Sequence, residues 1–401
     1  MKKKKTWRKF RHRVITEIAR RILGLYSRLA YHIRVEKFKE QGKRPYLILL
    51  NHQTAADQFF VGMAFRDPVY YVATEDLFSN GFVSKLLRYA VAPIPIKKQT
   101  TDVRAVLNCM RVAKEGGTIA IAPEGNRTYS GKTEYIKPAI AALVRKLNLP
   151  LAFFRIEGGY GVQPRWSDVT RKGKMCARVA RVVEPAEYKA LSDDELCALI
   201  NKELYVNEAA LTGTFPHKKS AEYLERAMYV CPFCGLSEFE SHGELVHCKK
   251  CGCKVQYLPT KELKGIGCDF PFRFVGEWYD YQSEFVRKLD YTAYLATPMH
   301  RDTAQLSEVI VYKNKRLLEE CIGVSLYGDR VVIHRETPWE LPFDGVEAMA
   351  VLGRNKLNIY FEGKVYQLKS HKRFNALRFV HAYYHYKNSK EGITNGEFLG
   401  L

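Results

Sequence analysis

The chain has 401 residues, a formal net charge of +21 and a hydrophobic share of 46%. This length predicts about two to four domains, and the composition excludes a mainly disordered chain. No stretch reaches the roughly 18 consecutive apolar residues of a membrane-spanning helix. The MKKKK start lacks the apolar segment of a signal peptide. We therefore expect a cytoplasmic protein whose excess positive charge faces lipid headgroups, nucleic acid or a phosphorylated substrate.

Residues 1–35 have the pattern of a basic amphipathic helix. Residues 2–21 contain ten Lys or Arg and one acidic residue, Glu17. The apolar residues recur at every third or fourth position and are Trp7, Phe10, Val14, Ile18, Ile22, Leu25, Leu29 and Ile33. Such a helix is typical of proteins that bind an anionic membrane surface. We therefore expect a peripheral protein on the cytosolic face of a membrane. The alternative is an ordinary helix packed on its own domain, with its charges in solvent.

Strand and helix signals alternate from residue 36 to residue 222. The expected strands are 45–50, 69–73, 91–96, 118–122 and 151–156. The expected helices are 103–113, 138–144 and one that follows the capping box Ser192–Glu195. This alternation predicts the α/β class, with a mostly parallel sheet flanked by helices. A functional site is expected at the carboxyl ends of the strands.

A histidine and a carboxylate follow the first expected strand. The sequence reads Asn51-His52-Gln-Thr-Ala-Ala-Asp57. An Asp that binds one ring nitrogen fixes the tautomer and leaves the other nitrogen free to accept a proton. No recognisable nucleophile elbow accompanies the pair, so the base would act directly on a hydroxyl group. Alone, a His-x4-Asp pattern is also compatible with a structural or solvated pair.

A second motif follows the fourth expected strand. Pro123-Glu124-Gly125-Asn126-Arg127 combines a turn, whose backbone N–H groups are exposed, with a guanidinium that can bind phosphate through two hydrogen bonds. Lys97, Lys98 and Lys132 would add positive charge. The alternative is a surface turn with solvated charges.

Together and in this order, the motifs resemble those of the glycerolipid acyltransferases typified by 1-acyl-sn-glycerol-3-phosphate acyltransferases. That family carries N-H-x4-D, a block that ends in a basic residue, F-P-E-G-T-R-S and a proline-containing strand. The residues that match are Asn51, His52, Asp57, Pro123, Glu124, Gly125, Arg127 and Pro150. Lys98 stands where the family usually has Arg, and Ala122, Asn126 and Thr128 depart from the third motif. The resemblance covers roughly residues 40–210.

The resemblance implies a glycerol-3-phosphate acyltransferase-like fold and an O-acyltransfer reaction. His52 would deprotonate the acceptor hydroxyl, which attacks the thioester of acyl-CoA or acyl carrier protein, while Asp57 orients His52. Lys98, Glu124, Gly125 and Arg127 would bind the acceptor, a lysophospholipid such as 1-acyl-glycerol-3-phosphate. The alternative within this fold is acyl transfer to the hydroxyl of another lipid or metabolite.

Two Cys-x-x-Cys-Gly knuckles mark residues 223–260. They contain Cys231, Cys234, Cys248 and Cys251, a spacing that predicts a structural Zn²⁺ site in a short β ribbon. Disulfides are the alternative, and Cys253 is the alternative fourth ligand. Zinc ribbons include nucleic-acid binders, so a non-enzymatic nucleic-acid-binding protein is a second hypothesis. The ribbon lacks interleaved aromatic and basic residues, and this absence disfavours the nucleic-acid-binding hypothesis.

Residues 261–401 predict a mainly-β domain closed by a helix. The strand signals, with period two, are 309–312, 322–326, 330–334, 357–361 and 364–368. A helical pattern follows from Phe374 to Tyr384. This order resembles the pleckstrin-homology-like domain in topology only. The domain could bind a lipid or a partner, or it could have a structural role only. Residues 255–306 are rich in aromatic residues but have no clear helix or strand pattern, so we assign them to no element.

Overall fold

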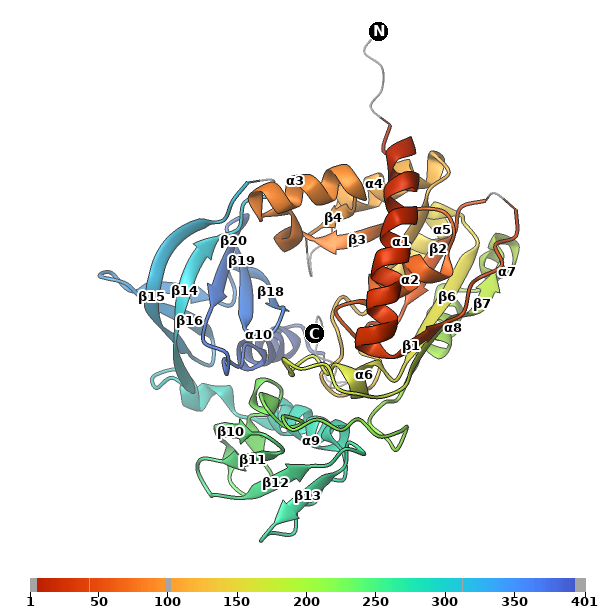
Figure 1. Cartoon of the computed structure of the whole chain (residues 1–401). Coiled ribbons are helices and arrows are strands. Elements are labelled where there is room, and N and C mark those ends of the chain that lie inside the picture. Colours follow the sequence, from red (N-terminus) through yellow and green to blue (C-terminus); the bar gives the residue numbers. More distant parts are fainter. Residues whose placement is uncertain (1–5, 43, 98–101, 312, 394–401) are drawn as a thin grey trace.

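The computed structural model describes residues 6–42, 44–97, 102–311 and 313–393. Figure 1 shows an α/β part from red to yellow-green, a small β part in green, and a β part in blue that ends in a helix. Lys98, assigned to the acceptor by the sequence, lies outside the described residues.

The α/β part is built on a seven-stranded sheet of order β1-β7-β6-β2-β5-β3-β4. Its strands are β1 (Ile33–Val35), β2 (Leu47–Leu50), β3 (Val69–Thr74), β4 (Ile94–Ile96), β5 (Thr118–Ile121), β6 (Leu151–Glu157) and β7 (Met175–Val183). Every neighbouring pair is parallel except β6 and β7. The α/β class with a mostly parallel sheet is therefore confirmed.

Helices cover both faces of this sheet (Figure 1). They are α1 (Phe10–Tyr31), α2 (Asp57–Ala64), α3 (Gly81–Ala90), α4 (Val103–Lys114), α5 (Ala139–Leu147), α6 (Gly159–Val162), α7 (Pro185–Lys189) and α8 (Asp193–Leu204). Leu47 and Leu49 of β2 join a core with α4, α5 and α8, whereas Ile48 and Leu50 join a core with α1 and α2. Burial on both faces explains why β2 is continuously apolar.

Two strands of this sheet were not predicted. The N-terminal helix was expected to continue to residue 35, but it ends at Tyr31 because His32 adopts a left-handed φ of 49°. Residues 33–35 then pair with β7. β7 itself alternates buried and more exposed residues and carries Arg178 and Arg181, so it lacks the continuous apolar run of β2.

The apolar stripe of α1 faces away from the protein. Its exposed residues are Phe10, Val14, Ile18, Ile22, Leu25 and Leu29, and Phe10 is 83% exposed. The opposite face packs on α2, where Gly24 lies against Met63 and Arg20 donates to the Gly62 carbonyl at 2.9 Å. Helix α1 therefore does pack on its own domain, but through the face opposite the apolar stripe. No described helix is both long and apolar enough to cross a membrane.

Helix α3 extends this exposed apolar surface. Arg11 of α1 donates to the carbonyl of Tyr89 in α3 at 3.0 Å, so the two helices are in contact. The exposed apolar residues of α3 are Phe82, Val83, Leu86 and Tyr89, of which Phe82 is 77% exposed. We call the exposed apolar residues of α1 and α3 the α1–α3 face.

The small β part contains a two-stranded sheet and a four-stranded antiparallel sheet. Its strands are β8 (Val230–Cys231), β9 (Gly235–Leu236), β10 (Phe239–His242), β11 (Leu245–Cys248), β12 (Lys254–Tyr257) and β13 (Leu263–Ile266). β13 extends the sheet beyond residue 260, where the ribbon was predicted to end. Helix α9 (Val275–Lys288) then occupies part of the stretch that the sequence left unassigned.

The C-terminal part is a seven-stranded antiparallel sheet of order β17-β16-β15-β14-β20-β19-β18, followed by α10 (Leu377–Lys390). Its strands are β14 (His300–Glu308), β15 (Arg316–Leu326), β16 (Arg330–His334), β17 (Trp339–Pro342), β18 (Val346–Leu352), β19 (Lys356–Phe361) and β20 (Lys364–Lys369). A mainly-β domain closed by a helix is thus confirmed. The strand expected at 309–312 is wrong, because β14 ends at Glu308.

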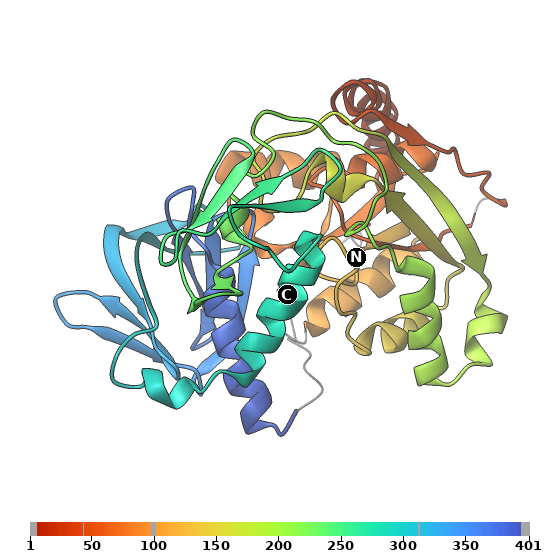
Figure 2. The ribbon, with the colours of Figure 1, turned by 90° about the horizontal axis from the view of Figure 1, so that it is seen from below.

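One hydrophobic core joins the small β part to the C-terminal part. It includes Val246 and Val255 of the ribbon, Trp278 of α9 and Tyr383 of α10, together with Trp166 from the α/β part. Figure 2 shows α9 (teal) and α10 (blue) side by side, and the two helices are in contact. The ribbon is therefore not an independently packed module.

Candidate active site

His52 and Asp57 meet where β2 ends. His52 Nδ1 lies 2.8 Å from Asp57 Oδ2, and Asp57 is the first residue of α2. A carboxylate only accepts hydrogen bonds, so Nδ1 carries the proton and Nε2 holds the free lone pair. The His52 side chain is 28% exposed, and its Nε2 has no hydrogen-bond partner among the described residues. The ring can therefore receive a proton from a bound molecule.

The Asp57 carboxylate is held by its own loop. Its side chain is 1% exposed. It accepts the backbone N–H of Gln53 at 2.7 Å, the backbone N–H of Thr54 at 2.9 Å and the Thr54 hydroxyl at 2.7 Å. With the His52 ring this makes four donors on two oxygens. The Asp57 side chain is thus fixed before any ligand binds, and it fixes the ring in turn.

Glu124 joins the His52 loop to the turn after β5. Its carboxylate accepts the backbone N–H groups of His52 and Glu134, each at 2.7 Å. Burial raises its pKa well above the ordinary value, although both hydrogen bonds act in the opposite direction. Thr128 N–H also donates to the His52 carbonyl at 3.3 Å. These contacts place the two sequence motifs side by side, while a contact between Glu124 and the acceptor stays a prediction.

Arg127 is a half-buried cation in the same turn. Gly125 has a φ of +70° and its N–H closes the turn on the Ala122 carbonyl at 3.0 Å, a conformation that favours glycine. Burial, with the neighbouring cations of Arg165 and Arg354, lowers the pKa of Arg127 to about 10. Its buried Nη1 has no hydrogen-bond partner in the described parts of the chain. An anionic ligand would stabilise this charge.

Sequence reasoning missed two arginines near this cation. Arg165 donates through Nη1 to the Arg127 carbonyl and through Nη2 to the carbonyl of Val351 in β18, each at 3.0 Å. Arg354, in the turn after β18, pairs with Asp168 at 3.2 Å. Both residues belong to contacts between the α/β part and the C-terminal part. No local motif contains them, so only tertiary structure reveals their position.

The other predicted cations are placed differently. Lys132 pairs with Asp280 of α9 at 2.5 Å and therefore serves an interdomain contact. The backbone N–H of Lys97 donates to Asp102, the N-cap residue of α4. The structure thus brings His52, Asp57, Glu124, Gly125 and Arg127 together on two bonded loops.

The four predicted zinc ligands form a second cluster. The Sγ atoms of Cys231, Cys234, Cys248 and Cys251 all lie within 4.8 Å of one another. Two of the distances are 3.6 Å (Cys231 to Cys251) and 3.5 Å (Cys234 to Cys248). A tetrahedral site with Zn–S bonds of about 2.3 Å needs sulfur atoms about 3.8 Å apart, so the residues fit the ion.

The knuckle geometry supports the same set of four thiols. Gly235 and Gly252, which follow the two knuckles, have φ angles of +74° and +75°. Cys253, the alternative ligand, has its Sγ 3.0 Å from the Sγ of Cys268 and is outside the cluster.

Comparison with known proteins identifies the α/β part. Residues 31–157 match the model of the Acyltransferase family. Residues 31–157 therefore form an acyltransferase domain. The match extends from the end of α1 to the end of β6 and contains both bonded loops. The ribbon and the C-terminal part of the acyltransferase lie outside the matched residues.

Eight chains among the solved structures match the acyltransferase. One is the crystal structure of the 1-acyl-sn-glycerophosphate (LPA) acyltransferase PlsC from Thermotoga maritima, with 21% sequence identity and a TM-score of 0.40. The alignment covers 48% of this chain and 76% of that chain. No curated protein matches the chain.

Proposed function

We propose that this acyltransferase transfers a fatty acyl group from acyl-CoA or acyl carrier protein to the hydroxyl of a lysophospholipid such as 1-acyl-glycerol-3-phosphate. One observation carries the proposal. His52 has its Nδ1 bound to a buried carboxylate and its Nε2 open, and its loop is bonded to the turn that carries Arg127. Arg127 is half-buried, and its buried Nη1 has no partner among the described residues.

The reaction follows from this arrangement. His52 Nε2 takes the proton of the acceptor hydroxyl while the oxygen attacks the thioester carbonyl. The C–S bond breaks, an ester C–O bond remains, and the departing thiolate takes the proton back from His52. Asp57 stabilises the intermediate imidazolium and holds its orientation. Arg127 binds the acceptor phosphate, and we assign Lys98 a second positive charge for it, an ammonium in place of a guanidinium. Glu124 holds the two loops in register.

The acceptor assignment is tested with purified protein and four substrate pairs. Lysophosphatidic acid and glycerol 3-phosphate are each offered with acyl-CoA and with acyl carrier protein, and release of free thiol is measured. We expect product from lysophosphatidic acid with at least one donor. If only glycerol 3-phosphate gives product, the acceptor is this smaller molecule and not a lysophospholipid. If no pair gives product, the acceptor hydroxyl belongs to another class of molecule.

Replacing Arg127 with glutamine is expected to weaken acceptor binding. Loss of a charge-assisted contact of about 1.5–3 kcal/mol raises KM for lysophosphatidic acid by about 10- to 100-fold. KM for the acyl donor should stay within about twofold, because the donor does not need this contact. The matched control is Arg104→Gln on the exposed face of α4. An unchanged KM for lysophosphatidic acid in a folded R127Q protein would remove the phosphate role.

We infer that the four-cysteine cluster holds a structural zinc ion. With four protein ligands, such a site has no open coordination position and takes no part in acyl transfer. Cys231, Cys234, Cys248 and Cys251 would be the ligands, and Ser237 Oγ, 2.9 Å from Cys248 Sγ, would hydrogen-bond to that thiolate.

We further propose that the α1–α3 face binds an anionic membrane from the cytosolic side. Exposed Phe, Ile and Leu side chains next to many basic residues fit a headgroup boundary and its negative potential. The face belongs to the same α/β part as His52, so it would hold the enzyme where lysophospholipids reside.

Two charge substitutions in α1 test this face. Phe10→Asp with Ile18→Asp removes two exposed apolar groups worth about 1.5–3 kcal/mol each when buried. Binding to vesicles that contain phosphatidic acid should fall at least about tenfold in a flotation assay. Leu245→Asp, an exposed apolar position on the ribbon, is the control and should bind as the parent does. Equal flotation of all three proteins would contradict the proposal.

A further inference from the structure

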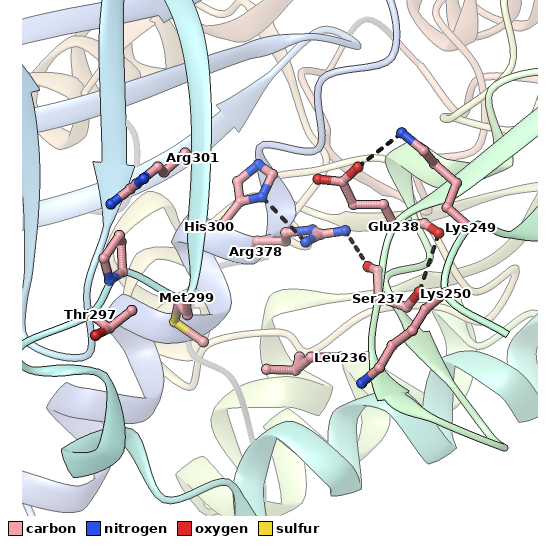
Figure 3. A pocket seen from close by; sticks show the side chains of 11 residues that line it. Leu236, Ser237, Glu238, Lys249, Lys250, Thr297, Met299, His300, Arg301 and Arg378 are labelled. Carbon is pink, nitrogen blue, oxygen red and sulfur yellow. Dashed lines mark hydrogen bonds and ion pairs between the residues drawn. The ribbon is translucent and has the colours of Figure 1, made fainter.

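A cavity lies between the ribbon and the C-terminal β part, apart from the His52 loops. It has a volume of about 600 Å³ and is lined by β9, the β9–β10 loop and the β11–β12 turn on one side, and by β14 and α10 on the other. A second cavity of about 330 Å³ adjoins it, and Glu238, Lys249, His300, Arg301 and Arg378 line both. Figure 3 shows His300 and Arg378 close to Glu238 and Lys249 of the ribbon, while Arg301 extends on the other side of β14.

The lining of the larger cavity is strongly cationic. Lys249, Lys250, Arg301 and Arg378 face a single carboxylate, Glu238. That carboxylate pairs with Lys249 at 3.2 Å. Three cations remain without a carboxylate partner in the cavity, and low-dielectric walls strengthen their combined field.

The partners of these three cations are incomplete. Among the described residues, Lys250 Nζ donates only to the neutral Cys234 carbonyl, at 3.1 Å. Arg301 makes no side-chain hydrogen bond or ion pair with any residue that the structure describes. Arg378 donates to the Ser237 carbonyl at 2.6 Å and lies 3.4 Å from His300 Nδ1, while its buried Nε lacks a partner in the described chain. A bound anion would add a partner to these cations, which no carboxylate of the larger cavity pairs with.

The zinc site does not explain this charge. Four thiolates around Zn²⁺ carry two net negative charges, and Lys249 and Lys250 lie between two of the ligands, so these lysines partly neutralise the cluster. Arg301 and Arg378 come from β14 and α10, outside the ribbon. Both nevertheless line the same cavity, and this excess of positive charge points to a ligand.

We propose that this junction cavity binds a phosphate ester, either a free phosphorylated metabolite or the headgroup of a phospholipid. A tetrahedral phosphate accepts hydrogen bonds from guanidinium and ammonium groups in several directions at once. The volume fits a small polar molecule. In the adjoining cavity, Asp302 and Glu240 offer acceptors for the hydroxyls of that molecule. Bound between Lys250 and Arg301, the ligand would fasten the ribbon to the C-terminal part.

Hydrogen–deuterium exchange on the full chain tests the site and its location. The probes are sn-glycerol 3-phosphate and vesicles of phosphatidylcholine with and without phosphatidic acid. If glycerol 3-phosphate protects residues 236–250 and 297–302, the ligand of the cavity is a free phosphate ester. Protection only by vesicles with phosphatidic acid assigns a headgroup. Protection at residues 51–57 and 123–131 reports the acyltransferase site separately, so failure of one proposal is distinguished from failure of the other.

Charge reversal gives the matched comparison. Lys250→Glu with Arg301→Glu changes two exposed side chains and should weaken protection of the junction by about tenfold or more in apparent affinity. Lys264→Glu, an exposed lysine of β13 outside the cavity, should leave it unchanged. Absence of junction protection with every phosphate probe overturns the proposal. Protection by polyglutamate alone would also overturn it, because the partner would then be an acidic polypeptide.

Discussion

Replacing His52 with alanine is expected to lower the rate of acyl transfer by about 10²–10⁴-fold, the contribution of a positioned general base. The fold should remain intact, since the ring is partly exposed and Asp57 keeps three other donors. The measurement is thiol release from acyl-CoA at saturating lysophosphatidic acid, with circular dichroism and the melting temperature recorded for the same protein.

The control for this substitution is His242→Ala, which removes an exposed histidine of the ribbon that pairs with Glu240. It should retain the parent rate. Asp57→Asn gives a second comparison, because an amide in place of the carboxylate no longer stabilises the imidazolium. A folded H52A protein with parental kcat would show that His52 is not the base.

Removal of the zinc ion that we propose for the four-cysteine cluster is expected to unfold more than the ribbon. Structural zinc contributes about 10 kcal/mol or more to small zinc domains, comparable with the total stability of a typical protein. The ribbon shares one core with α9, the C-terminal sheet and α10. A strong chelator, or Cys231→Ser with Cys248→Ser, should therefore expose backbone amides from residue 223 to residue 393 to exchange.

The same experiment separates the two halves of the protein. The α/β sheet has two cores of its own, so α4 and α5 should keep most of their protection. The control is Cys321→Ser, an exposed thiol outside the cluster. Metal analysis should find one zinc per chain in the parent and none in the double variant. Unchanged exchange in a zinc-free chain would contradict the structural role of the metal.

The predictable elements are those whose signal is local. The β2 strand is predicted because burial on both faces makes it continuously apolar. Helix α8 begins at the predicted capping box, in which Ser192 accepts the Glu195 N–H at 3.2 Å and Glu195 accepts the Ser192 N–H at 2.7 Å. The spacing from His52 to Asp57 spans one loop, so the sequence alone brings the two side chains within reach.

Elements that depend on distant partners escaped sequence reasoning. Strand β1 exists because β7 pairs with it across more than a hundred residues of chain. β17 and β18 were not predicted, although they complete the C-terminal sheet at its two edges. The apolar stripe of α1 was visible as a stripe, but only packing on α2 decided that it faces outward.

The sequence by itself determined the α/β class, the His52–Asp57 pair, the turn with Arg127 and the set of four cysteines, because each depends on residue type and short-range spacing. Tertiary structure alone decided that Glu124 binds the two loops together, that Arg165 and Arg354 crowd Arg127, and that ribbon and C-terminal part enclose a cationic cavity. These features join side chains from segments far apart in the chain. Their positions follow from how whole elements pack, which no local pattern encodes.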